Sequence, residues 1–292
     1  MTQSKIIRVG CRGTDFCRAQ TRKILDLLSA KEPAARFEVE EIPPGPNSAS
    51  ILEALAEGRI QLHIRGAREL PVKLRPGVQI AACTERNDPF DVLVSQGGML
   101  LEDFAPGGVV GVESARVSVQ LGRFREDVKM RLVDGTVDRL LPLLEKGEVS
   151  GFVVAAEDVE TLGWEGLVAE VFPPDILLPA AGQGSFALLT QEGDDKIAAM
   201  ARAIDHELTR QVITAERAFL RELDVEITDP VAVHGRMEDG AILLEGMLGD
   251  AVSGALLRDE LDGEPGEGED LGVRLAKLFM ADGAVDYLAS YK

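Results

Sequence analysis

Two spacings of apolar residues alternate along the first part of the chain, and they predict a succession of strands and helices. An apolar run at 6–12 predicts a strand, and apolar positions every three or four residues over 15–30 predict a helix lying on a sheet. Strands at 36–42 and 62–64 follow, separated by a short helix at 49–57. Strand, helix, strand, helix, strand is the order expected of a parallel sheet.

The same order begins again near residue 100 and predicts a second α/β unit. Its strands are expected at 109–112, 128–133 and 152–156, and its helices at 115–124 and 136–145. Two similar units joined by short crossings predict two lobes with a cleft between them.

The pattern changes in the last third of the chain. A long helical pattern at 194–223, whose charges we expect to form a solvated face, precedes β-like segments at 231–234 and 241–248 and an amphipathic helix at 271–280. This order predicts a small α+β C-terminal domain after the two lobes. The expected domains are 1–96 together with about 188–222, then 97–187, and then 223–292.

Composition and charge narrow the classes of function. The formal net charge is −19, while the first hundred residues carry a slight positive excess. A negative field of this size repels nucleic acid and anionic lipid, so neither partner is expected. No stretch of the sequence reaches the roughly 18 consecutive apolar residues that span a bilayer, and no secretory signal is visible. We therefore expect the protein to be located in the cytoplasm.

Cysteine and histidine give no pattern of a metal site. The cysteines are odd in number, Cys11, Cys17 and Cys83, and we expect all of them to be reduced and buried. The three histidines are far apart in the sequence. No metal is therefore expected.

Candidate chemistry lies in the stretch from 61 to 95. Arg68 and Glu69 follow the buried strand at 62–64, and loops at the ends of such strands often hold the working residues of α/β proteins. The positive excess of the first hundred residues also places the expected groups for an anionic ligand there.

Several segments, taken in order, resemble the hydroxymethylbilane synthase family, also called porphobilinogen deaminase. Each segment is weak alone, but their order and spacing cover nearly the whole chain. The segments are Arg8–Arg12 with Thr14 and Gln20, Arg68–Pro71, Glu85–Asp91, Val110–Gly111 with Ser114 and Arg116, Leu144–Glu148, Pro173–Gly184 and Thr214–Ala218.

The resemblance implies an α/β fold with two periplasmic-binding-protein-like lobes, a cleft, and a small α+β C-terminal domain. Members of the family hold a dipyrromethane cofactor by a thioether to a cysteine of the third domain. They join porphobilinogen units head to tail with loss of ammonia. One aspartate serves the pyrrole chemistry, and arginines and lysines bind the acetate and propionate groups.

This sequence departs from the family at those positions. Ile227 stands at the cofactor-cysteine position, and a hydrocarbon cannot form a thioether, so no cofactor is expected. Glu69 stands at the aspartate position, one methylene longer. Of the paired arginines after Ser114 only Arg116 remains, followed by Val117, and Asp134 reverses a charge. These changes predict a degenerate or altered enzyme of tetrapyrrole ancestry.

Three interpretations remain open from the sequence. The first is a working hydroxymethylbilane synthase, and the second is a two-lobed protein that binds a small anionic or pyrrole ligand or performs an altered reaction. The third is an acidic interaction protein without catalysis. A monomer is expected. Glu69 is the candidate catalytic residue, and the candidate anion-binding residues are Arg12, Thr14, Arg68, Ser114 and Arg116.

Overall fold

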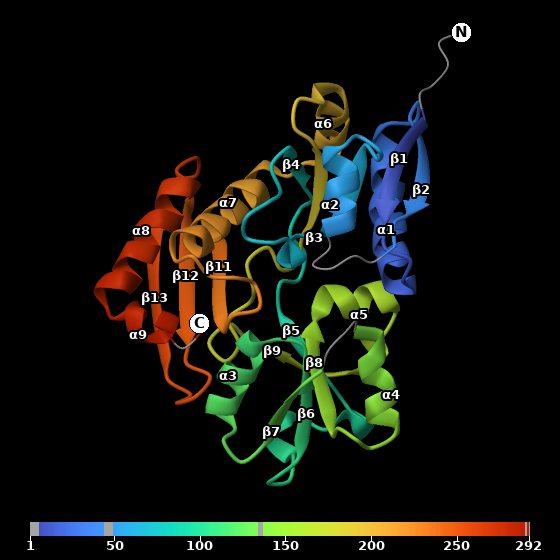
Figure 1. Cartoon of the computed structure of the whole chain (residues 1–292). Coiled ribbons are helices and arrows are strands. Elements are labelled where there is room, and N and C mark those ends of the chain that lie inside the picture. Colours follow the sequence, from blue (N-terminus) through green and yellow to red (C-terminus); the bar gives the residue numbers. More distant parts are fainter. Residues whose placement is uncertain (1–5, 44–48, 134–136, 290, 292) are drawn as a thin grey trace. The chain divides into compact units, whose positions relative to one another are not determined.

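The computed structural model describes residues 6–43, 49–133, 137–289 and 291 (Figure 1). The chain forms two compact units. The first comprises 1–86 and 185–210, and the second comprises 87–184 and 211–292. The polypeptide thus leaves the first unit once and returns to it before ending in the second.

The first unit is built on a mixed five-stranded sheet in the order β2-β1-β3-β10-β4. β1 runs parallel to β2 and β3, whereas β10 is antiparallel to both of its neighbours. The strands are β1 (Ile6–Cys11), β2 (Arg36–Glu41), β3 (Leu62–Gly66), β4 (Val78–Cys83) and β10 (Phe186–Gln191). The parallel strands therefore bring the segments that follow β1 and β3 to one edge of the sheet.

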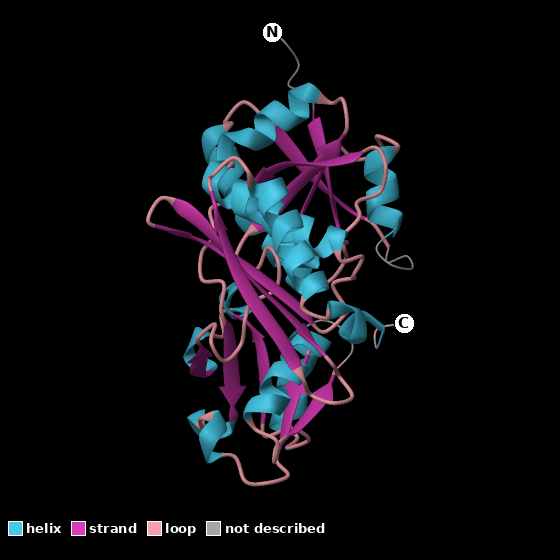
Figure 2. Cartoon of the chain, turned by 90° about the vertical axis from the view of Figure 1, so that its left-hand side faces the viewer, coloured by secondary structure: helices cyan, strands magenta, loops and turns pink. Residues whose placement is uncertain are grey.

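Helices α1 (Asp15–Lys31), α2 (Ala49–Ala56) and α6 (Asp195–Ala201) belong to this unit, and Figure 2 shows helices on both sides of its sheet. Thr14 caps α1 by accepting a hydrogen bond from the amide of Cys17 at 3.2 Å. The core joins α1 to the sheet through fully buried side chains such as Leu28 and Leu62. This packing fixes the start of α1 beside the end of β1.

The second unit contains a sheet of the same design, in the order β7-β6-β8-β5-β9. β6 is parallel to β7 and β8, and β5 is antiparallel to β8 and β9. The strands are β5 (Asp91–Ser95), β6 (Val109–Val112), β7 (Lys129–Leu132), β8 (Gly151–Ala155) and β9 (Val168–Phe172), and the helices are α3 (Ala115–Phe124), α4 (Leu140–Glu145) and α5 (Ala156–Leu162).

The C-terminal part of the second unit is an antiparallel sheet covered by helices. Its order is β11-β12-β13, and Phe219 of α7 meets Phe279 of α8 edge to face with ring centroids 5.1 Å apart. The elements are α7 (Glu207–Glu222), β11 (Val231–Glu238), β12 (Ala241–Gly249), β13 (Leu256–Gly263), α8 (Gly268–Ala281) and α9 (Ala284–Ala289).

The predicted α/β class is confirmed, and the structure shows two five-stranded sheets and a smaller three-stranded one. The elements β9, α5 and β13 were not predicted. The prediction that the charges of 194–223 form a solvated face is wrong for Glu216 and Arg217, whose exposed fractions are 0 % and 6 %. The predicted domain boundaries stay a prediction. In the structure, residues 223–292 belong to the same compact unit as the second sheet.

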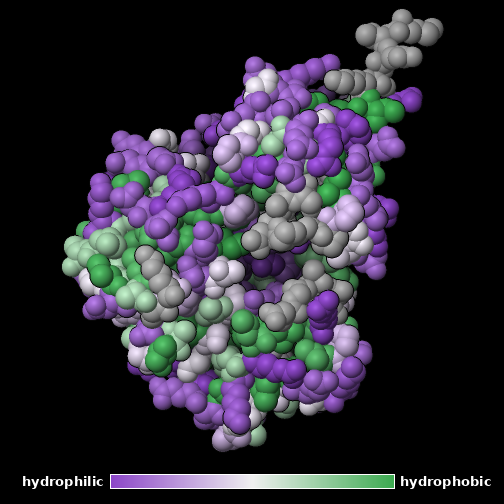
Figure 3. All heavy atoms as spheres, in the orientation of Figure 1, coloured by the Kyte–Doolittle hydropathy of each residue, from purple (hydrophilic) through white to green (hydrophobic). Residues whose placement is uncertain are grey.

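Among the helices in the described ranges, none combines the length and the apolar character that a bilayer crossing requires. On the face drawn in Figure 3, hydrophilic and apolar side chains are interspersed.

Candidate active site

Glu69 lies in the short 3-10 turn Ala67–Glu69 directly after β3, and its carboxylate is the centre of the candidate site. Oε2 accepts a hydrogen bond from Nε of Arg65 at 2.9 Å. Oε1 is buried and has no hydrogen-bond partner among the described residues. The carboxylate thus keeps one oxygen available while the other is held.

The charge state of Glu69 follows from its surroundings. Burial alone would raise the pKa of this carboxyl, but the positive charges of Arg65, Arg68 and Arg12 together lower it. The side chain of Glu69 is 22 % exposed, so these interactions are only partly screened by water. At neutral pH the site holds an ionised carboxylate among three guanidinium groups.

Arg12 follows β1, and burial together with the charge of Arg65 lowers the pKa of its guanidinium. Arginine nevertheless stays protonated in proteins, so Arg12 remains a cation. Because β1 and β3 are parallel neighbours, the segments after them, which hold Arg12 and Glu69, lie at the same edge of the sheet. The structure therefore brings together Arg12, Arg68 and Glu69, three of the residues that the sequence singled out.

A small pocket lies beside these charges, with a free volume of about 240 Å³ when open solvent at its mouth is included. The enclosed space that a water centre can occupy is only about 10 Å³, so the pocket itself holds a group about the size of one water molecule rather than a chain of rings. The residues that line it are Cys11, Arg12, Cys17, Gln20, Thr21, His63, Ile64 and Arg65.

His63 contributes a neutral imidazole to that pocket. Its Nδ1 lies 2.9 Å from the carbonyl oxygen of Gly10, and because a carbonyl only accepts, Nδ1 donates. Burial, with repulsion from Arg65 and Arg12, lowers the pKa of His63 to about 4. Nε2 is therefore unprotonated above that pH and can accept a hydrogen bond.

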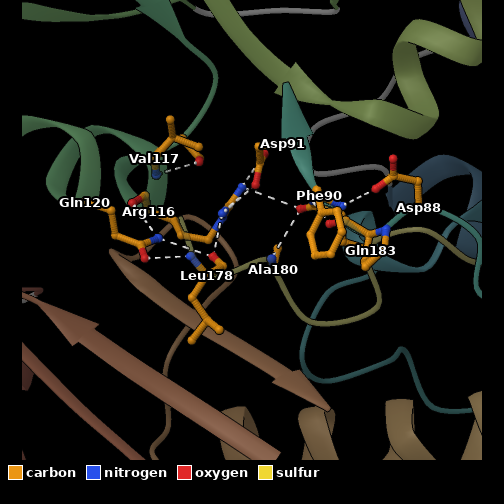
Figure 4. Close-up of polar contacts among 11 residues, drawn as sticks. Asp88, Phe90, Asp91, Arg116, Val117, Gln120, Leu178, Ala180 and Gln183 are labelled. Atoms are coloured by element: carbon orange, nitrogen blue, oxygen red, sulfur yellow. Dashed lines mark hydrogen bonds and ion pairs between the residues drawn. The ribbon is translucent and has the colours of Figure 1, made fainter. Parts of the chain in front are cut away.

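Ser114 and Arg116 belong to the second unit, and Figure 4 shows how Arg116 is bound. Its guanidinium donates to Asp91 at 2.8 and 3.0 Å and to the carbonyl oxygen of Leu178 at 2.7 Å. Gln120, one turn later, bonds both the amide and the carbonyl of Leu178. Arg116 and Gln120 together hold the segment before β10 against α3.

The two predicted hydroxyl residues have matching local roles. Ser114 caps α3 by accepting from the amide of Val117 at 3.3 Å, as Thr14 caps α1 in the first unit. Each hydroxyl keeps its own hydrogen for donation. Asp134, where the sequence indicated a reversed charge, lies outside the described residues. The ligand-binding roles of Thr14, Ser114 and Arg116 stay predictions.

Family comparisons agree with this arrangement. Residues 48–199 match the family model for the dipyrromethane cofactor binding domain of porphobilinogen deaminase, and residues 210–281 match the model for its C-terminal domain. The chain belongs to the porphobilinogen deaminase family. The resemblance inferred from the sequence is thereby confirmed.

Curated relatives match over nearly their whole length. A porphobilinogen deaminase of Thermus thermophilus is 33 % identical over 300 residues, covering 99 % of this chain and 100 % of the relative. One of Roseiflexus castenholzii is 33 % identical over 299 residues, covering 97 % and 98 %.

Solved structures of two-lobed binding proteins are more distant. A nutrient-binding protein from Burkholderia cenocepacia has a TM-score of 0.47 at 12 % identity and covers 68 % of this chain and 91 % of that chain. The aliphatic sulphonate binding protein of Escherichia coli has a TM-score of 0.43 at 18 % identity, with coverage of 75 % and 70 %.

The expectation that no cofactor is involved is wrong, because about half of the first lobe and all of the second match a dipyrromethane cofactor binding domain. One missing attachment atom does not remove the noncovalent part of a binding site. The noncovalent part of the site fits: the buried Oε1 of Glu69 lacks a partner, and the cations Arg12 and Arg65 suit carboxylate groups. The covalent part does not fit at Ile227, a half-exposed hydrocarbon.

Sequence reasoning missed part of this site. Arg65 is the hydrogen-bonded partner of Glu69, and His63, Cys17 and Gln20 line the pocket next to it. A helical signal was present, since Cys17 and Gln20 are three residues apart on one face of α1. Cys11 and Cys83 are buried as predicted, whereas Cys17 is only half-buried.

Proposed function

We propose that this protein binds porphobilinogen and releases ammonia from it at the carboxylate of Glu69. The observation that carries the proposal is the single carboxylate with one bonded and one unpartnered oxygen, surrounded by guanidinium groups at the edge of the first sheet. Membership of the porphobilinogen deaminase family gives the reaction class.

The residues have distinct roles in this proposal. Arg12 and Arg68 bind the carboxylates of the substrate, because a guanidinium can offer two parallel donors to such a group. Glu69, kept ionised by its neighbours, stabilises the positive charge that develops on a pyrrole when the amine departs, and its unpartnered oxygen can accept a proton. Arg65 holds the carboxylate in position.

A dipyrromethane, when bound, supplies the pyrrole carbon to which further pyrrole units are joined. Arg12 and Arg65 are the residues of the first unit that would hold its carboxylates. The proposal also includes three expectations from the sequence: that the protein is located in the cytoplasm, that it is a monomer, and that its ligand is a small pyrrole.

The test is incubation of the purified full-length chain with porphobilinogen, followed by thermal unfolding and an assay for ammonia. Mass action predicts a higher Tm with porphobilinogen, and Arg12→Gln should reduce the shift. Arg59→Gln is the matched control, because Arg59 is 51 % exposed and pairs with Glu57 outside the site. A chain whose Tm is unchanged by porphobilinogen and which releases no ammonia would overturn the proposal.

A further inference from the structure

One thiol of the chain belongs to the candidate site. Cys17 lies in the first turn of α1, and it lines the pocket with Arg12, His63 and Arg65. Cys11 and Cys83 are each only 1 % exposed, whereas Cys17 is half-buried. Cys17 is therefore the thiol that a molecule entering the pocket can reach.

A second observation points to a ligand in the same pocket. Gln20, one turn after Cys17, is 3 % exposed, and its Nε2 has no hydrogen-bond partner among the described residues. A buried amide without a partner costs about 1–3 kcal/mol, so such groups are usually satisfied by a bound molecule or a water. The unpartnered donor of Gln20 and the thiol of Cys17 belong to residues that line the same pocket.

The charges around Cys17 act in both directions. Burial raises the pKa of the thiol, and Glu69 adds to that effect, while the hydrogen bond with Thr14 and the cations Arg12 and Arg65 oppose it. The N-terminal turn of a helix also favours a thiolate. Cys17 is thus mainly a thiol at neutral pH, with cations in place to stabilise the thiolate when its proton leaves.

We propose that Cys17 is a covalent attachment site for a pyrrole, formed by reaction of its thiol with the aminomethyl carbon of porphobilinogen. The S–C bond forms as the C–N bond of the aminomethyl group breaks, and the thiol proton leaves with the nitrogen, as ammonium from the protonated amine. No oxidant or reductant is consumed. The inference rests on the proposed function and gives this chain an attachment atom that position 227 lacks.

The size of the pocket limits what lies within it. The enclosed space of about 10 Å³ accommodates a group about the size of one water molecule, so only the polar end of a ring substituent would enter against Gln20 and His63. The unprotonated Nε2 of His63 can accept from a pyrrole N–H, and Nε2 of Gln20 can donate to a carboxylate. These two groups would orient a pyrrole whose methylene carbon reaches Sγ of Cys17.

The test is intact-protein and peptide mass spectrometry of the full-length chain before and after incubation with porphobilinogen. We expect a mass increase equal to porphobilinogen less ammonia for each unit added, on the peptide that contains Cys17. Cys17→Ser should lose the adduct, and Cys83→Ser, which changes a buried thiol outside the pocket, should keep it. An adduct on any other residue, or one that persists in Cys17→Ser, would overturn the inference.

A second measurement keeps the two proposals distinguishable and needs no variant. Iodoacetamide should label Cys17 before Cys11 and Cys83 in the folded wild-type chain, and porphobilinogen should slow that labelling at least tenfold. Ammonia release and a Tm shift without any adduct would leave the proposed function standing and end the role of Cys17. Absence of ammonia release, Tm shift and adduct would end both.

Discussion

Arg116 and Asp91 form a two-point ion pair inside the second unit, with N–O distances of 2.8 and 3.0 Å. Their side chains are 6 % and 2 % exposed. Arg116 lies in the first turn of α3, which follows β6, and Asp91 is the first residue of β5. In the sheet, β8 lies between β6 and β5, so the pair joins the helix to a strand that is not adjacent to β6. The guanidinium is thus committed to the protein itself, whatever else it binds.

Arg116→Met should lower the free energy of unfolding of the second unit by about 3–5 kcal/mol, because it leaves a buried carboxylate without its counter-ion. Arg123→Met is the matched control in the same helix. Arg123 is 62 % exposed and lies 3.2 Å from Glu126, so its loss should cost less than about 1 kcal/mol. Urea unfolding of both variants measures the difference, and equal losses would contradict a structural role for the buried pair.

Glu69→Gln should reduce the rate of ammonia release from porphobilinogen by about 10²–10⁴-fold, the range expected for losing a positioned acid–base group. Glu57→Gln, which alters an exposed glutamate paired with Arg59, should leave the rate unchanged. A Glu69→Gln variant with wild-type rate would remove Glu69 from the chemistry.

The sequence indicated which segment of the chain holds the candidate site, but not which side chains contact one another there. Arg68 and Glu69 are neighbours, but Glu69 ends the 3-10 turn that follows β3, and its carboxylate pairs with Arg65 near the end of that strand. The pairing of Arg116 with Asp91 joins residues 25 apart and has no local signal. Such contacts depend on the packing of distant elements.

The same limit explains the errors in the fold. β9 and β13 carry charged residues among half-exposed apolar ones, so neither shows the clear alternation of a half-buried strand. Glu216 lies in a helix rich in charge, yet it is buried and accepts hydrogen bonds from the amides of Gly182 and Gly235. Periodicity shows that a helix has a charged residue but not whether distant backbone amides need that residue.

His63 should make the stability of the first unit depend on pH between about 6.5 and 4. Its pKa is about 4 in the folded chain and 6.5 when unperturbed, so the unfolded state takes up the proton first as the pH falls. The stabilisation is complete above pH 6.5 and is lost progressively down to pH 4, a total of about 3 kcal/mol.

The variant His63→Asn keeps a donor for the carbonyl of Gly10 but cannot be protonated in this range. Its unfolding free energy should therefore fall less than that of the wild type between pH 6.5 and 4, by about 3 kcal/mol. His206→Asn controls for the loss of an imidazole elsewhere in this unit. Urea unfolding at several pH values gives the comparison, and the same acid dependence in the wild type and His63→Asn would contradict the assignment.

Gly272→Ala should destabilise the second unit because α8 and α7 approach too closely there for a side chain. A Cβ at position 272 would lie 2.2 Å from the carbonyl oxygen of Ala215 and 2.7 Å from Cβ of Ala218. Alanine gains about 1 kcal/mol of helix propensity over glycine, but forcing a methyl into a packed interface typically costs about 1–3 kcal/mol, and here backbone atoms must move. The clash should therefore outweigh the propensity.

Gly166→Ala is the control, since no atom lies within 4 Å of its Cβ, and it should be neutral or slightly stabilising. Urea unfolding followed by far-UV circular dichroism measures both variants, and a Gly272→Ala chain as stable as Gly166→Ala would show that the two helices are not packed this closely.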